Sequence, residues 1–325
     1  MILTDYFYPQ YDISWDLAVQ CGVRHGVIRL PEDDSFNLTD PACWDDLCGR
    51  FLSHGIRPLV VEPLPNCLHD HIKTGDAKRD ESIETFLKML PIMRDHGIGT
   101  VCFNFMAHVG WLRTSSDIPA RGGALVTGFR MADYRPIDAR ITEEALWENY
   151  RYFVNAAVPE AEKWGVRLAL HPDDPPLPRL GEVSRIMISL KNIQRALAIR
   201  PSSALGVTFC QACYRMMGED VERCARELRD KILFIHFRNC VGQAEDFRET
   251  FHDDGCIDMA RMIALYSELN LRDVPIRIDH VPTMGHVEKE KMDALPAGYG
   301  TMGRPFAIGY LKGLIEMYES AHPAR

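Results

Sequence analysis

Residues that can bind a metal ion stand at the ends of successive apolar segments in the second half of the sequence. His171, Cys210, His236 and Asp279 occupy these ends and offer two imidazoles, a thiol and a carboxylate. Each of them alone is more often a structural core residue. One ligand-type residue at every successive strand end, however, supplies a full ligand set for one divalent ion. We therefore predict a metal site formed by these four residues.

Further polar residues lie close to the predicted ligands and are candidates for substrate binding. Arg277 precedes Asp279 by two positions, and Arg238 follows His236. Because arginine pairs bidentately with carboxylates, these side chains suit an anionic substrate. A structural ion pair is an equally open interpretation of Arg277. The predicted substrate contacts are Asn104, Arg113, Arg238, Asn239, His252 and Arg277.

Short apolar runs alternate with segments of helical periodicity along the whole sequence. Strands are predicted at Ile2–Tyr6, Gly26–Leu30, Pro58–Glu62, Thr100–Phe105, Val166–His171, Leu205–Cys210, Ile232–Phe237 and Val274–Asp279. Helices are predicted at Ile13–Cys21, Pro41–His54, Asp80–His96, Glu143–Trp164, Gly181–Ile199, Glu219–Arg229, Asp258–Leu269 and Arg304–Tyr318. Thr142 reads as the N-cap of one helix, and Gly165 reads as its end.

This alternation predicts an α/β fold, a single (β/α)8 TIM barrel that spans residues 1–325 as one domain. A doubly wound open sheet is the alternative, but no GxGxxG motif follows an early strand. In a barrel the C-terminal ends of strands five to eight are neighbours, which brings the predicted metal ligands together. Two long loops, Asn66–Lys78 after strand 3 and Met106–Ile141 after strand 4, are expected to lie over the same face.

The composition and charge of the chain limit the kinds of molecule that the protein is expected to bind. The chain has 325 residues and a formal net charge of −9, which argues against nucleic-acid and anionic-membrane binding. No apolar run approaches the roughly 18 residues that a membrane span needs. The first residues read as a strand rather than a secretion signal, and ten cysteines are scattered along the chain. We expect a cytoplasmic protein, a homo-oligomer, that acts on an anionic small molecule.

Several motifs resemble those of bacterial mannonate dehydratase. They are Leu170-His171-Pro172-Asp173-Asp174-Pro175-Pro176, Thr208-Phe209-Cys210, His236-Phe237-Arg238-Asn239, Arg277-Ile278-Asp279-His280, Trp111-Leu112-Arg113-Thr114 and Gly298-Tyr299-Gly300. The resemblance runs in order over nearly the whole chain. It implies an enzyme that takes water from a sugar acid, D-mannonate or a related aldonate, to give a 2-keto-3-deoxy sugar acid.

The resemblance also implies roles for individual residues. His171, Cys210, His236 and Asp279 match the family's metal ligands, and Mn²⁺ is its usual metal. On ligand softness alone Zn²⁺ would suit, and Fe²⁺ or Co²⁺ are further alternatives. His280 and Tyr299 match the family's acid/base pair.

The chain departs from the family pattern at three places. Gly110 stands where the family has an aspartate, Val281 replaces a glycine, and the segment Ala212–Met217 differs from the family's small residues. We therefore expect a preferred sugar acid other than D-mannonate, unless His108 takes over the role of the aspartate that position 110 lacks. Two rival functions stay open: a sugar isomerase or epimerase on the same kind of barrel, and a binding protein without turnover.

Overall fold

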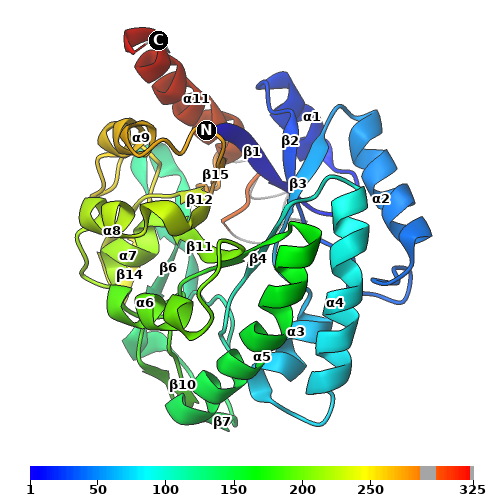
Figure 1. Cartoon of the computed structure of the whole chain (residues 1–325). Helices are drawn as coiled ribbons and strands as arrows, with labels where there is room; N and C mark the ends of the chain where they lie inside the picture. Colours follow the sequence, from blue (N-terminus) through cyan, green and yellow to red (C-terminus); the bar gives the residue numbers. More distant parts are fainter. Residues whose placement is uncertain (286–297, 323–325) are drawn as a thin grey trace.

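Eight parallel strands form a closed barrel in the computed structural model, which describes residues 1–285 and 298–322. Helices surround the barrel (Figure 1). The barrel strands, in their order around the barrel, are β1 (Ile2–Phe7), β2 (His25–Ile28), β3 (Arg57–Val61), β4 (Thr100–Phe103), β8 (Arg167–Leu170), β11 (Leu205–Cys210), β12 (Ile232–Phe237) and β15 (Pro275–Ile278). Pairing of β15 with β1 closes the ring, and the predicted (β/α)8 barrel is confirmed.

The barrel strands are apolar because both of their faces are covered. Every residue of β12, Ile-Leu-Phe-Ile-His-Phe, is buried, as expected for a parallel strand between a barrel interior and a layer of helices. Side chains alternate between the two faces along a strand. A small apolar cluster draws members from most of the barrel strands and fills the interior, and it contains Tyr6, Val27, Val60, Cys102, Ala169, Leu233 and Phe234.

The helices cover the outside of the barrel. They are α1 (Ile13–Gln20), α2 (Pro41–Ser53), α3 (Asn66–Thr74), α4 (Arg79–Asp95), α5 (Glu143–Trp164), α6 (Leu190–Ile199), α7 (Gln211–Met216), α8 (Val221–Glu227), α9 (Met259–Glu268) and α11 (Gly303–Ala321). The hydroxyl of Thr142 accepts a hydrogen bond from the Ala145 N–H at 3.2 Å, which confirms the predicted N-cap of α5. The helix ends at Gly165, whose φ of 65° is the left-handed conformation that glycine adopts without strain.

Several segments differ from the predicted elements. The segment after β3, predicted as a long loop, contains α3, whose buried Leu68, His69 and Ile72 occupy one face. Packing of that face stabilises a helix that no side-chain cap begins, so local signals alone did not indicate it. The prediction of a helix from Gly181 is also wrong at its start. Residues 182–184 form a strand, β10, and the helix begins only after Ser189 caps it.

Additional strands lie at the end of the barrel where the parallel strands finish. The long segment after β4 contains β5 (Ser115–Pro119), β6 (Leu125–Arg130) and β7 (Arg140–Ile141). β5 and β6 join β14 (Asp246–Glu249) and β13 (Cys240–Gln243) in a four-stranded antiparallel sheet, while β7 pairs with β10 beside β9 (Arg179–Leu180). The predicted loop after strand 4 therefore contains three strands, two of which belong to the four-stranded sheet.

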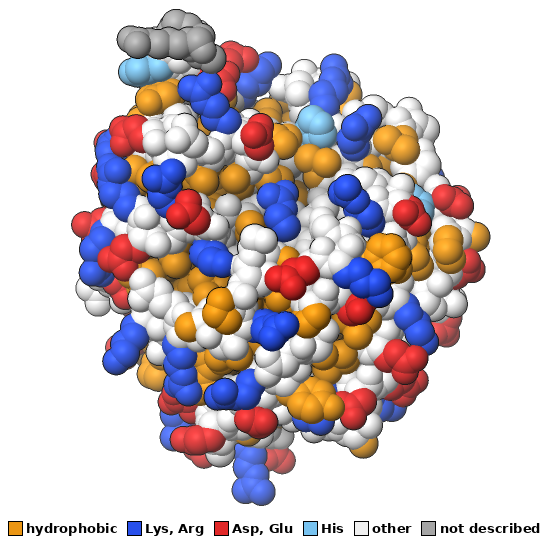
Figure 2. Space-filling model, viewed as in Figure 1, with side chains coloured by type: hydrophobic (Ala, Val, Ile, Leu, Met, Phe, Trp, Pro, Cys, Tyr) orange, Lys and Arg blue, Asp and Glu red, His pale blue; other side chains and the backbone are white. Residues whose placement is uncertain are grey.

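The molecular surface in Figure 2 carries acidic and basic side chains that are intermixed over the visible face. Within the described residues, the helices are all too short or too polar to span a bilayer.

Close packing between β11 and β12 predicts the effect of a side chain at Gly206. A Cβ there would collide with the Lys231 carbonyl and the Leu233 side chain. Gly206→Ala should therefore lower the free energy of unfolding by about 1–3 kcal/mol, measured by urea denaturation. Gly309→Ala is the matched control, because a Cβ in α11 meets nothing within 4 Å. It should raise stability by about 0.5–1 kcal/mol. Equal effects of the two variants would contradict this packing.

Candidate metal centre and active site

The alternation of side chains along the strands explains why so many polar residues meet at one end of the barrel. Ala169 and Phe234 belong to the interior cluster, so His171 and His236, two positions further, also point inward. The same parity applies at the ends of the other strands. The resulting cavity holds about 280 Å³ and is lined at its base by His171, His236, Asp279, Glu62, Cys102 and Arg277.

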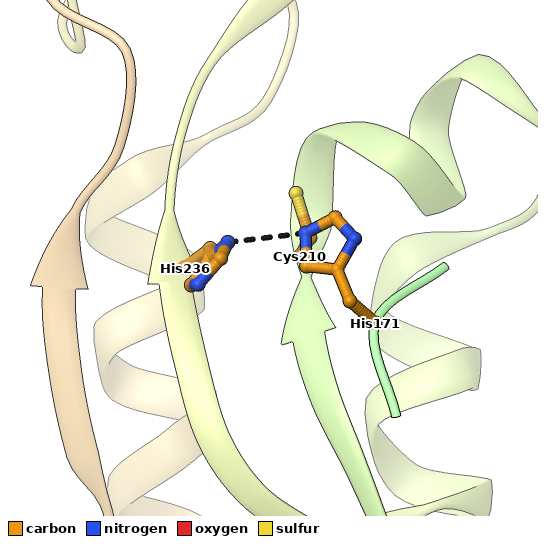
Figure 3. A group of neighbouring side chains, drawn as sticks. All are labelled: His171, Cys210 and His236. Atoms are coloured by element: carbon orange, nitrogen blue, oxygen red, sulfur yellow. Dashed lines mark hydrogen bonds between the residues drawn. The ribbon is translucent and has the colours of Figure 1, made fainter. Parts of the chain in front are cut away.

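Three of the predicted metal ligands converge closely. The ligand atoms of His171, Cys210 and His236 lie within 4.8 Å of one another (Figure 3). His171 Nε2 is 3.2 Å from His236 Nδ1. The other ring nitrogens have partners: His171 Nδ1 donates to the Pro172 carbonyl at 2.6 Å, and His236 Nε2 lies 3.0 Å from Glu62 Oε1. His171 Nε2 and His236 Nδ1 therefore face each other across a short gap, the arrangement of two imidazoles that could bind one cation.

Asp279 adds a carboxylate beside this group. Its Oδ2 lies 3.4 Å from His236 Nδ1, while its Oδ1 accepts a hydrogen bond from Arg277 Nη1 at 2.8 Å. Burial favours the neutral carboxyl, but Arg277 and the neighbouring imidazoles outweigh it and hold the pKa of Asp279 well below its usual value. The carboxylate is ionised and one of its oxygens faces the candidate ligands.

Cys210 has the electrostatic environment of a thiolate. Burial opposes ionisation, but the Cys213 thiol and the Arg238 guanidinium outweigh it and hold the pKa of Cys210 well below the ordinary value. Arg238 Nη1 lies 3.5 Å from the sulfur. Thiolates are the form of cysteine that binds metals. Two imidazoles, a thiolate and a carboxylate fit a divalent transition-metal ion.

A second group of ligand-type residues shares His236 but differs in charge. Glu62, Cys102 and His236 also have ligand atoms within 4.8 Å of one another. Arg277 already neutralises Glu62, with Nε and Nη2 at 2.9 and 3.0 Å from its two oxygens. Burial raises the pKa of the Cys102 thiol to about 11, so this sulfur stays protonated. This group is a poorer cation site than the first.

The two residues matched to an acid/base pair lie against Asp279. His280 Nε2 is 3.6 Å and the Tyr299 hydroxyl is 3.4 Å from its carboxylate oxygens. The two rings meet edge to face at 5.3 Å, and a bridge between Val281 and Tyr299 holds their segments side by side. His280 has a φ of 44°, a conformation that non-glycine residues seldom adopt outside constrained sites.

The protonation states of this pair are complementary. Burial lowers the pKa of His280 to about 4, so the imidazole is neutral near pH 7 and can accept a proton. Burial raises the pKa of Tyr299 well above its usual value, so the phenol keeps a proton that it can donate. Trp111 stacks on His280 with ring centroids 5.1 Å apart and covers the imidazole.

Two of the predicted substrate-binding arginines belong to a buried ion-pair network. Arg113 pairs with Asp174 at 2.8 Å and with Glu249 at 2.6 Å, and Arg238 pairs with the same two acids at 2.7 and 2.6 Å. Two cations thus neutralise two carboxylates with almost no exposure to water. Neither arginine lines the cavity. Their positions indicate that they support the loops around the cavity.

The remaining predicted substrate contacts divide into two groups. Asn104 and Arg277 line the cavity, although the guanidinium of Arg277 is occupied by Glu62 and Asp279. Asn239 and His252 are buried behind it. Asn239 Nδ2 donates to the carbonyls of His252 and Ile257 at 3.0 Å, and His252 Nε2 lies 2.9 Å from the Phe237 carbonyl. These two residues have structural partners and lie outside the cavity lining.

Some residues of the cavity wall were not predicted from the sequence. Tyr8 and Arg29 line it, and both occupy inward positions just after β1 and β2. The alternation of the first two strands could have identified them. Lys73 also lines the cavity but lies in α3, where no helix was predicted. Asp174 belongs to a motif that was recognised, whereas its partner Glu249 lies on a strand that was not predicted.

Comparison with known proteins identifies the family. The family model described as D-mannonate dehydratase (UxuA) matches residues 50–140 and 129–324. A mannonate dehydratase of Streptococcus agalactiae is 31% identical over 297 residues, 81% of this chain and 82% of that protein. That of Oceanobacillus iheyensis is 31% identical over 298 residues, 82% of each. The chain belongs to the mannonate dehydratase family.

Solved structures agree with this family membership. The crystal structure of mannonate dehydratase from Streptococcus suis serotype 2 superposes with a TM-score of 0.89 at 27% identity, over 99% of this chain and 96% of that one. D-psicose 3-epimerase from Clostridium cellulolyticum H10 superposes with a TM-score of 0.62 at 11% identity, over 97% of this chain and 99% of that one, which shows a shared fold alone. The family resemblance predicted from the motifs is confirmed, and dehydration is favoured over epimerisation.

Removal of single donors should empty the candidate metal centre. Cys210→Ala and Asp279→Ala each delete one of four donors, and we expect near-complete loss of metal, measured by elemental analysis of the purified proteins. Cys224→Ala is the control, because it deletes a buried thiol outside the group. Stoichiometric metal in both donor variants would rule out this assignment.

Arg238→Met should act on stability rather than on substrate affinity. It leaves buried Asp174 and Glu249 with one arginine between them, which should cost about 3–5 kcal/mol of unfolding free energy. Arg238 lowers the pKa of both carboxyls in the folded state. Its contribution to the free energy of unfolding is therefore complete above the unfolded pKa values of about 4. This contribution is lost as the pH falls from there through the lower folded pKa values. The difference in stability from wild type should therefore shrink below about pH 4.

The exposed pair partner Arg261 supplies the control for this measurement. Arg261→Met removes contacts to Glu222 and Glu268 at the surface and should cost at most about 1 kcal/mol. An Arg238→Met protein with unchanged stability and a raised KM would instead assign Arg238 to substrate binding.

Proposed function

We propose that this protein is a metal-dependent hydro-lyase that removes water from a sugar acid, D-mannonate or a related aldonate. The product is the corresponding 2-keto-3-deoxy sugar acid. The observation that supports this most directly is the position of His280 and Tyr299, both within 3.6 Å of a carboxylate oxygen of Asp279, at the base of one cavity. Proton-transfer groups beside metal-donor atoms are the arrangement that an elimination next to a carboxylate requires.

The candidate centre fits a divalent ion held by His171, Cys210, His236 and Asp279. Such an ion would act as a Lewis acid toward the oxygen atoms of the substrate. One member of the His280/Tyr299 pair takes the proton from the carbon next to the carboxylate. The other member donates a proton to the hydroxyl that leaves from the following carbon, so one water molecule is released. The enol that results takes up the 2-keto form.

The chain's own residues also control access of water and the orientation of the pair. Trp111 covers one face of His280, and the edge of the Tyr299 ring packs against it, so these two contacts hold the direction of the imidazole. Asp279 accepts a contact from the Tyr299 hydroxyl at 3.4 Å, which orients the phenol toward the candidate ligands. Acid–base assistance contributes about 10²–10⁴-fold, and the remaining acceleration comes from positioning and charge stabilisation.

The metal and the cellular setting are part of the proposal. We propose Mn²⁺, on the basis of the family resemblance, while the donor set would also accept Zn²⁺, Fe²⁺ or Co²⁺. All ten cysteines are free thiols, which supports a reducing compartment such as the cytoplasm. A homo-oligomer and an anionic small-molecule substrate stay part of this prediction.

Turnover of the metal-reconstituted protein with a panel of aldonates and uronates tests the proposed reaction. Elimination lowers the substrate mass by one water and yields a 2-keto acid, whereas isomerisation and epimerisation leave the mass unchanged. Mass spectrometry of the products therefore separates the proposal from the isomerase alternative. Tight binding across the panel without any product would favour a binding protein.

His280→Asn and Tyr299→Phe should retain metal and fold but lose turnover by about 10²–10⁴-fold. Both changes delete proton transfer and nearly preserve shape. His96→Asn and Tyr152→Phe, which change a partly buried and an exposed residue outside the cavity, should leave turnover unaltered. The measurement is kcat with metal content and melting temperature recorded in parallel. A wild-type rate in either active-site variant would remove that residue from the pair.

A further inference from the structure

The wall of the cavity opposite the candidate metal ligands has its own chemistry. It is formed by Tyr8, Arg29, Asn66 and Lys73, which come from the ends of β1 and β2 and from α3. Asn66 is exposed and Tyr8 and Arg29 are partly exposed, whereas three of the four candidate ligands are buried and His171 is partly buried. This wall is therefore near the mouth, where the far end of a substrate held at the base would lie.

The positions of these side chains follow from the sequence. Arg29 is two residues after Val27, an interior residue, and so it points into the barrel at the end of β2. Asn66 and Lys73 are seven residues apart, two turns of α3, and share one face of the helix. Glu32 joins the two elements, because its oxygens accept from Arg29 Nη2 at 2.6 Å and from the Asn66 N–H at 2.8 Å.

Among the described residues, Arg29 and Lys73 are the two cations of the lining whose N–H donors are least occupied by acidic partners. Arg277 uses four of its five N–H donors on Glu62, Asp279 and the Ile278 carbonyl. Arg29 has five N–H donors, and its ion pair within the described chain is with Glu32. The Lys73 ammonium pairs with Asp70 at 2.8 Å. The Lys73 side chain is 3% exposed. The ammonium has two further N–H bonds, and Lys73 is part of the cavity lining.

The acidic side chains that line the cavity pair with other arginines, while Glu32 and Asp70, outside the lining, each pair with one of these two cations. Asp279 and Glu62 pair with Arg277, and Asp174 pairs with Arg113 and Arg238. Gly110 lines the same cavity without a side chain, and a Cβ there would meet nothing within 4 Å of the described residues. Of the three departures from the family pattern, only Gly110 lies in this lining, and His108 does not replace it there. The cavity is therefore open at position 110, where the chain contributes neither a side chain nor a charge.

We propose that Arg29 and Lys73 form a distal anion subsite and that the preferred substrate carries an acidic group at both ends. This inference rests on the proposed function, since one carboxylate is taken to lie at the candidate metal centre. A terminal carboxylate and a terminal phosphate share the chemistry that these cations recognise. A terminal anion would add a charge-assisted contact to the donors that Glu32 and Asp70 leave free, whereas a neutral terminal hydroxyl would add only a weaker neutral contact.

Three probes that differ only at carbon 6 test the subsite. They are D-mannonate with a terminal hydroxyl, D-mannarate with a terminal carboxylate, and 6-phospho-D-mannonate with a terminal phosphate. With the metal-reconstituted protein, kcat/KM for one of the doubly charged probes should exceed that for D-mannonate by about 10- to 100-fold, the value of a charge-assisted contact. Whichever doubly charged probe is preferred identifies the anionic group.

Substitutions then locate the effect. Arg29→Met and Lys73→Met should each reduce this preference about tenfold or more, mainly through KM for the doubly charged probe. Gly110→Asp should reduce it as well, by placing a negative charge in the open space. Lys88→Met removes an exposed cation of α4 that pairs with Glu84 and serves as the control. Arg29 is partly exposed, so its variant stays informative if Lys73→Met fails to fold.

The outcomes separate this inference from the proposed function. The subsite is refuted if D-mannonate is turned over as well as both doubly charged probes and the kcat/KM ratios between the probes are unchanged in Arg29→Met. The proposed dehydration would stand in that case. If no probe is turned over, the proposed function fails. Calorimetry with the metal-loaded protein then decides the subsite: binding of a doubly charged probe that weakens about tenfold in Arg29→Met supports it, and equal binding of all three probes refutes it.

Discussion

The carboxylates of Glu62 and Asp279 are buried at the C-terminal end of the barrel, and the arrangement of the site depends on the groups that neutralise them. Arg277 reaches both oxygens of Glu62 and one oxygen of Asp279. The other oxygen of Asp279 is left beside His236, whose Nδ1 faces His171 Nε2 at 3.2 Å. Anionic and lone-pair donors do not gather in a dry site without a counter-charge. A divalent ion held by these residues would supply that charge, and it would also supply the Lewis acid that elimination beside a carboxylate uses.

A second set of buried charges fixes the loops that complete the cavity. Arg113 and Arg238 share Asp174 and Glu249, and these residues come from segments that are far apart in sequence. Arg113 also lies over the ring of Trp111, 4.5 Å from its centroid, and Trp111 in turn stacks on His280. The network thereby connects the antiparallel sheet at the barrel mouth to the orientation of a candidate proton-transfer group. The buried ion pairs of Arg113 therefore help to position His280 through Trp111.

Much of the candidate metal centre could be predicted because it depends on strand parity. His171, Cys210 and His236 follow apolar runs at inward positions, which a sequence displays directly. The roles of the arginines are harder to predict, because the local sequence does not indicate which acid pairs with which guanidinium. Glu249 lies 136 positions from Arg113, on a strand with no clear period of its own. Lys73 was missed for a related reason, because α3 is stabilised by packing rather than by its local sequence.

The central claim is that one divalent ion sits among His171, Cys210, His236 and Asp279. Anomalous diffraction from crystals of the Mn²⁺-loaded protein, collected on both sides of the metal absorption edge, tests it most directly. The account predicts one peak within about 2.0–2.5 Å of His171 Nε2, Cys210 Sγ, His236 Nδ1 and Asp279 Oδ2. A peak instead among Glu62, Cys102 and His236, or no peak inside the barrel of a metal-loaded crystal, would contradict it.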